Sequence, residues 1–122
     1  MGGSLTVITI MPADKAFLDS IGADTGVDAL VLRESDGTVS GHALFRVEGD
    51  TVELLGVVSD EPLMVDGLIR SVLNAGDYRG AQYGLCRIES LLPHLKRLEF
   101  TPAEDGWRVS LEAFFRTGCG CH

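Results

Sequence analysis

Three stretches in the first half of the chain combine apolar and β-branched residues with turn signals at their ends, the pattern that predicts β-strands. In the middle stretch apolar and polar side chains alternate, which indicates one buried face and one more polar face. The turns between them, Ser35-Asp36-Gly37-Thr38 and Glu48-Gly49-Asp50, suit tight hairpins. We therefore expect an antiparallel meander. Its strands are predicted over Asp28–Glu34, Val39–Val47 and Thr51–Ser59.

The last strand of this meander leads through the acidic loop Asp60-Glu61-Pro62 into the longest helical pattern of the chain. Apolar side chains then recur at positions i, i+1, i+4, i+5, i+8 and i+9, one broad stripe of an α-helix, and Gly76 is placed to end it. The stripe consists of Met64, Val65, Leu68, Ile69, Val72 and Leu73. A buried strand that enters a helix through a short loop leaves backbone N–H groups free at the helix start, and these groups form a generic anion site.

Further elements flank this strand-loop-helix unit. Leu5–Ile10 has strand propensity and is followed by a short helix that reaches Ile21 and ends at Gly22. After the long helix, Gln82–Arg87 is apolar enough for a strand. Because this strand is reached through a helix, we expect it to run parallel to Thr51–Ser59 as its neighbour, which makes a βαβ unit.

The C-terminal part of the chain predicts a short helix and a hairpin. The helix is expected over about Ile88–Leu95, shortened or kinked by Pro93. The turn segment 103–106 contains Asp and Gly, so Leu98–Thr101 is expected to pair with Trp107–Phe115, whose alternating apolar residues predict one strand. No repeat or linker interrupts the sequence. We therefore expect one domain over residues 1–122, with residues 116–122 as a flexible tail.

Composition and charge limit the partners. The chain has a formal net charge of −8, and nucleic acids or anionic membranes need clustered Lys and Arg, so we expect neither partner. No apolar run reaches the roughly 18 residues of a membrane span. Three cysteines without a secretory signal pattern make a disulfide framework improbable and indicate the reducing cytoplasm.

The order of the predicted elements resembles the GNAT superfamily of N-acetyltransferases. The resemblance rests on the strand-loop-helix of Glu53–Gly76 and on Leu95–Phe100, which looks like that family's passage from a helix end into a strand that starts with Gly-Phe. It implies an α/β (α+β) fold: a mixed, mostly antiparallel sheet with a central parallel strand pair and helices on both faces. It also implies acetyl-CoA bound between the two parallel strands and acetyl transfer to a small-molecule or protein amine.

The resemblance implies where the cofactor would bind. The pantetheine chain would pair with the backbone around Leu55–Val58, hence with Leu55, Val57 and Val58. The pyrophosphate would lie on main-chain N–H groups of Met64, Val65, Asp66, Gly67 and Leu68. The family pattern here contains a basic residue or Gln and two small residues, whereas the matching stretch has no basic residue and Gly67 as its one glycine. Asp60, Glu61 and Asp66 would also repel a pyrophosphate.

The resemblance implies a general base on the strand before the loop, and Glu53 occupies that position. The alternative for Glu53 is an ordinary glutamate near the start of a sheet strand. The family's usual acid is a Tyr in the helix before the Gly-Phe segment, but Leu95 stands there in this chain. The neighbouring His94 is expected to be a surface histidine.

The C-terminal residues offer a different chemistry. Cys119, Cys121 and His122 are soft ligands that suit Zn²⁺ or Cu(I), although zinc sites usually have at least two residues between cysteines. The alternatives are a mobile tail and a redox-active thiol pair. Cys86 is expected to be a small buried apolar residue.

Two functions of different classes therefore follow from the sequence. The first is an acyl-CoA-dependent N-acyltransferase that acetylates an amine, with Glu53 deprotonating the acceptor. The second is a non-catalytic GNAT-shaped interaction module, or a thiol- or metal-binding protein that uses the Cys-Gly-Cys-His tail. A homodimer formed through sheet edges is compatible with an apolar terminal hairpin.

Overall fold

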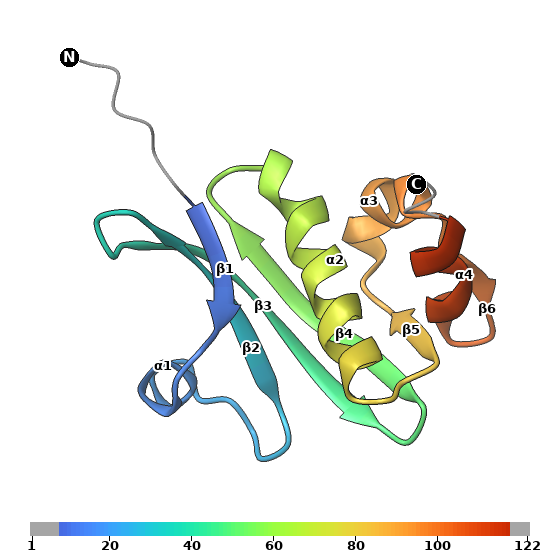
Figure 1. Ribbon diagram of the computed structural model, residues 1–122, viewed down its shortest axis with the longest axis horizontal. Coiled ribbons are helices and arrows are strands. Elements are labelled where there is room, and N and C mark those ends of the chain that lie inside the picture. The colour runs from blue at the N-terminus through green and yellow to red at the C-terminus, as the bar shows by residue number, and fades with distance from the viewer. Residues whose placement is uncertain (1–7, 118–122) are drawn as a thin grey trace.

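A seven-stranded mixed sheet forms the centre of the protein (Figure 1), whose computed structural model describes residues 8–117. The strands lie in the order β1-β2-β3-β4-β5-β7-β6. All neighbouring strands are antiparallel except β4 and β5, which run parallel. The strands are β1 (Ile8–Pro12), β2 (Asp28–Glu34), β3 (Val39–Glu48), β4 (Thr51–Ser59), β5 (Tyr83–Cys86), β6 (Thr101–Ala103) and β7 (Gly106–Ser110). The expected meander and the central parallel pair are confirmed.

Helices cover both faces of this sheet. The long helix α2 (Leu63–Tyr78) connects β4 to β5 and packs on one face, where it contacts β4, β3 and β2 (Figure 1). The short helix α1 (Lys15–Ser20) reaches the other face: its Phe17 ring meets the His42 ring edge-on at a centroid distance of 5.3 Å. Because side chains alternate along β3, His42 points away from the face on which Ala43 is buried under α2. Burial lowers the pKa of His42.

One hydrophobic core lies between α2, the sheet and the segment that follows β5. The apolar stripe of α2 supplies Leu68, Ile69, Val72 and Leu73, each at most 2% exposed, as the helical spacing predicts. The sheet supplies Phe45, Val52 and Leu54. The segment after β5 adds Leu91, Leu95, Leu98 and Phe100.

Strands β4 and β5 separate after only four residue pairs. Pairing runs from Thr51 with Tyr83 to Leu54 with Cys86, whereas β4 continues to Ser59. The register of β3 against β4 shifts at the same point, because Leu44 pairs with Gly56 while Phe45 pairs with Leu54. This leaves Leu55 as an extra residue in β4, which is a β-bulge that bends a strand. Among residues 8–117, the β5-facing side of β4 is therefore without a strand partner beyond Leu54.

The expected end of α2 at Gly76 is wrong, since the helix continues to Tyr78 and Gly80 takes the left-handed φ of 93° just after it. Gly76 instead permits a close contact. A Cβ atom at this position would lie 2.5 Å from Cβ and Cγ1 of Val52 on β4, closer than carbon atoms approach. The glycine therefore brings helix and sheet together rather than stopping the helix.

The C-terminal predictions are corrected in three places. The helix expected over Ile88–Leu95 is a 3₁₀ turn, η1 (Glu89–Leu91), followed by α3 (Leu92–Arg97), with Pro93 tolerated in the first turn. The segment Leu98–Phe100 is a helix cap, so β6 begins only at Thr101.

The long terminal strand is also wrong: β7 ends at Ser110, and α4 (Leu111–Thr117) follows. The Ser110 hydroxyl accepts a hydrogen bond from the Ala113 N–H at 3.3 Å and so caps the new helix. The spacing of Leu111, Phe114 and Phe115 suits a helix face as well as a strand.

Two glycines of α2 give opposite expected outcomes when changed to alanine. Gly76→Ala is expected to lower the free energy of unfolding by about 1–3 kcal/mol, because the added methyl group overlaps Val52. Gly67→Ala is expected to raise it by about 0.5–1 kcal/mol, because alanine favours the helix and the nearest atom lies 3.9 Å away. Urea unfolding of both variants checks this. Equal effects of the same sign would contradict the close helix–sheet contact.

Candidate functional site

Glu53 lies one residue before β4 leaves β5. Its neighbours Val52 and Leu54 are buried under α2, so the alternation of the strand turns Glu53 to the opposite face of the sheet. The Glu53 side chain is 22% exposed, and Oε2 lies 3.6 Å from Nε of Arg87, just past the end of β5. Arg87 also reaches Asp105 at 3.9 Å. The candidate base is thus a half-buried carboxylate at the vertex of the opening between the parallel strands.

The free edge of β4 lies next to Glu53. Residues 56–59 pair with β3 on one side, and beyond Leu54 the strand has no β5 partner on the other. Leu55 and Val57 are half-buried, whereas Val58 is 55% exposed. Along an unpaired strand edge every second residue directs both its N–H and its C=O outward, so this edge can hydrogen-bond an extended chain that carries amide groups.

The start of α2 differs from the generic anion site expected there. Pro62 occupies the N-cap position, and no side chain in the described part of the protein caps the helix. The N–H groups of Met64 and Val65 already donate to the carbonyls of Glu61 and Pro62, at 2.9 and 3.1 Å. Leu68 is fully buried, while Leu63 is 84% exposed. The structure places Met64, Val65, Asp66 and Gly67, four of the positions predicted from the sequence, in the first turns of α2.

A charged bridge connects the start of α2 to α3. Asp66 accepts hydrogen bonds from Arg97, at 3.0 Å from Nε and 3.1 Å from a terminal nitrogen, and its carboxylate lies 2.6 Å from Nδ1 of His94. His94 is only 21% exposed in its side chain, so the expectation of an ordinary surface histidine is wrong. The sequence contained one signal for this cluster: His94 and Arg97 are three residues apart and share a helix face.

The bridge fixes the charge of Asp66. Hydrogen bonds from Arg97 hold the pKa of Asp66 below its ordinary value, with a smaller contribution from His94 and against the opposing effect of burial. At neutral pH the first turn of α2 therefore carries a carboxylate. This charge is neutralised by Arg97 and is also close to any anion that approaches the helix start.

These residues fit one part of acetyl-CoA better than another. The free edge of β4 matches the two amide groups of a pantetheine chain in hydrogen-bonding capacity. The start of α2 offers no basic side chain of its own, two of its N–H groups are already bonded, and Asp66 adds negative charge. The described residues thus fit the pantetheine arm and give a poor fit to the diphosphate.

Neither Leu95 nor Cys86 supplies a general acid, and both side chains are buried. Leu95, at the position of the expected Tyr, is fully buried and has no proton to donate. Burial raises the pKa of the Cys86 thiol, and the nearby Glu53 carboxylate adds to the shift. Cys86 is therefore the small buried residue that the sequence predicted, held as a neutral thiol.

The tail chemistry lies outside the described residues, which exclude Cys119, Cys121 and His122. Within residues 8–117, no group of three His, Cys, Asp or Glu side chains is arranged to hold a metal ion. None of the helices in that part of the chain is both long and apolar enough to span a membrane.

Solved structures similar to this one are N-acetyltransferases. The ribosomal-protein-S18-alanine N-acetyltransferase from Escherichia coli gives a TM-score of 0.68 at 12% identity, covering 86% of this chain and 94% of its own. The spermidine/spermine N-acetyltransferase SpeG from Vibrio cholerae, in mutant forms, gives 0.71 at 7% identity, covering 91% and 99%. The GNAT family N-acetyltransferase YhbS from Escherichia coli, solved in complex with CoA, gives 0.66 at 14% identity, covering 93% and 87%.

No protein-family profile and no curated protein sequence matches this chain. At identities this low, the structural likeness shows the fold alone. The fold is that of the GNAT N-acetyltransferases, as the order of elements in the sequence predicted.

Proposed function

We propose that this GNAT-fold protein is an acyl-CoA-dependent N-acyltransferase that moves an acetyl group from acetyl-CoA to an amine. The observation that carries the proposal is the separation of β4 from β5 directly after Leu54, with Glu53 at the vertex and the β4 edge free beyond it. This arrangement supports the proposal, because the free edge would bind the donor next to Glu53 as the proton acceptor. The structure of the GNAT protein YhbS was solved with CoA, which agrees with this choice of donor.

The free edge of β4 would hold the extended arm of the donor. Main-chain groups of Leu55, Val57 and Val58 would bind its amide groups in the manner of an added strand, and this fixes the arm along β4. The bulge at Leu55 turns the strand away from β5 and so leaves room for the arm. Acetyl-CoA supplies a thioester carbonyl for the amine to attack.

Glu53 would prepare the acceptor. An amine is an ammonium ion at neutral pH and must lose a proton before its nitrogen can attack a carbonyl. The Glu53 carboxylate can accept that proton, and Arg87 at 3.6 Å orients the carboxylate. Because Leu95 replaces the family's Tyr, the proton for the leaving thiolate would come from water.

The acceptor would be a cationic amine on a small molecule or a protein. The neighbours are named for a protein-alanine and for spermidine/spermine acetylation, both of which use amines. The net charge of −8 attracts cations over a Debye length of about 8 Å at physiological salt. We also propose that the protein lies in the cytoplasm and forms a homodimer.

A second candidate function is favoured by the Asp66 bridge. Asp66 engages Arg97 with both carboxylate oxygens, and this links α2 to α3 at the mouth of the opening. A chain that has lost its hold on the cofactor's diphosphate would keep such a bridge and act as a non-catalytic binding module. The two candidates differ in one property, the binding of acetyl-CoA.

Glu53→Gln is expected to lower kcat/KM for amine acetylation by about 10²-fold or more, because the amide accepts no proton from the ammonium ion. The affinity for acetyl-CoA is expected to change little, since the donor binds main-chain groups. Steady-state rates measured by thiol release, with polyamines and peptide N-termini as acceptors, check this. Glu48→Gln, an exposed glutamate near the end of β3, is the matched control. Equal rates for wild type and Glu53→Gln would contradict the assignment.

Asp66→Asn is expected to strengthen acetyl-CoA binding roughly 5- to 30-fold, equivalent to about 1–2 kcal/mol, because one carboxylate near the diphosphate is removed and Arg97 is released. Acetyl-pantetheine, which lacks the diphosphate, should bind wild type and variant equally well. Calorimetric titration of both ligands measures the two effects. If Asp66→Asn weakened acetyl-CoA binding, Asp66 would be a positioning residue for the donor rather than an obstacle to it.

A further inference from the structure

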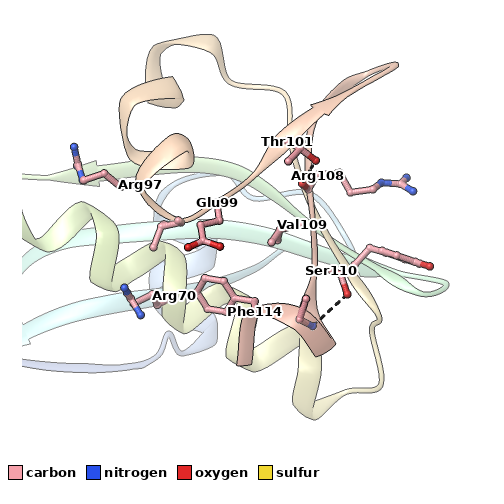
Figure 2. A pocket seen from close by; sticks show the side chains of 11 residues that line it. Arg70, Arg97, Glu99, Thr101, Arg108, Val109, Ser110 and Phe114 are labelled. Atoms are coloured by element: carbon pink, nitrogen blue, oxygen red, sulfur yellow. Dashed lines mark hydrogen bonds between the residues drawn. The ribbon is translucent and has the colours of Figure 1, made fainter. Parts of the chain in front are cut away.

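A cavity of about 430 Å³ lies on the side of the protein formed by α2, β7 and α4 (Figure 2). Its volume falls within the range of about 300–1,000 Å³ that is typical of small-molecule sites. Arg70 comes from α2, Leu98 and Glu99 from the end of α3, Val109 from β7 and Phe114 from α4. None of the lining residues belongs to β4, so this cavity does not include the free β4 edge or Glu53.

Two opposite charges border the cavity without neutralising each other. Figure 2 shows the Glu99 carboxylate and the Arg70 guanidinium near the Phe114 ring, and the guanidinium carbon lies 5.7 Å from the ring centroid. Among the described side chains, neither Glu99 nor Arg70 has an ion-pair partner. Two further arginines line the cavity but are engaged elsewhere: Arg97 bonds Asp66, and Arg108 stacks on Tyr83 at 5.1 Å.

The backbone holds Glu99 in a conformation that glycine prefers. Glu99 has φ 67° and directly follows the last turn of α3. The Phe100 N–H donates to the Leu95 carbonyl at 2.9 Å and the Glu99 N–H to that of Lys96 at 3.1 Å, which is the usual left-handed helix ending. Among the described residues, Glu99 alone has a positive φ without being glycine. Glycine at position 99 would therefore make the folded protein more stable than glutamate does.

We propose that this cavity binds a free α-amino acid with a large apolar side chain. Its ammonium group would pair with Glu99, its carboxylate with Arg70, and its side chain would pack against Phe114, Val109 and Leu98. A simple anion would be repelled by Glu99 and a simple cation by Arg70. Only a ligand with both charges satisfies the two side chains at once, and the aromatic and aliphatic walls supply the rest of the contact.

The experiment compares ligands that differ by one charge. L-phenylalanine and L-leucine are titrated against the full chain by calorimetry in the absence of acetyl-CoA, alongside 3-phenylpropionate and 2-phenylethylamine. The expected result is binding of the amino acids at least 10-fold tighter than binding of either single-charge analogue. Absence of amino-acid binding, or equal binding of an analogue, would overturn the proposal.

Variants test the two contacts separately. Glu99→Gln and Arg70→Gln are each expected to weaken amino-acid binding at least 10-fold. Glu99→Gly is expected to abolish binding while raising Tm of the free protein by a few degrees, because glycine relieves the left-handed strain, and this shows that the variant is folded. Unchanged affinity in Glu99→Gln or Arg70→Gln would overturn the proposal.

A final control separates this site from the proposed acyl transfer. Glu53→Gln is expected to bind the amino acid with wild-type affinity, whether or not the chain proves to be an acyltransferase. A loss of amino-acid binding in Glu53→Gln would show that the ligand occupies the β4–β5 opening instead and would overturn the assignment to this cavity.

Discussion

The close packing of α2 on β4 is the constraint on which the rest of the structure depends. Glycines permit a close approach at two points of this βαβ unit. A Cβ at Gly76 would meet Val52, and a Cβ at Gly84 on β5 would lie 2.5 Å from the Leu73 side chain. Below α2, β4 and β5 pair in parallel over four residue pairs. The bulge at Leu55 then bends β4 away, and an opening forms with Glu53 at its vertex.

The opening and the start of α2 impose opposite conditions on a ligand. The free β4 edge has the hydrogen-bonding capacity for an extended chain with amide groups, whereas the first turn of α2 carries a carboxylate whose pKa is held low by Arg97. In the proposed function these two regions would bind one cofactor, acetyl-CoA. The β4 edge suits this role better than the helix start, which is acidic and has two of its N–H groups bonded to nearby carbonyls. This combination predicts weak binding of the nucleotide part of acetyl-CoA.

Much of the fold followed from the sequence because local patterns and tertiary packing agree over most of residues 8–87. The sequence predicted the hairpin turns, the apolar stripe of α2 and the parallel crossover from β4 to β5. The end of the chain was not, because the apolar residues from Trp107 to Phe115 suit either a strand or, at Leu111, Phe114 and Phe115, a helix; the Ser110 cap decides for the helix. Sequence order also could not show that Asp66 and Arg97, 31 residues apart, share hydrogen bonds. The left-handed Glu99 was missed because its position is normally glycine.

We propose above that the free edge of β4 receives the arm of an acyl-CoA. Residue-resolved amide hydrogen exchange of the full chain, with and without saturating acetyl-CoA, tests it most directly. The account predicts slower exchange at alternate amides of residues 55–59, with no change in β1 on the far edge of the sheet. Unchanged exchange along residues 55–59 in the presence of bound acetyl-CoA would contradict it.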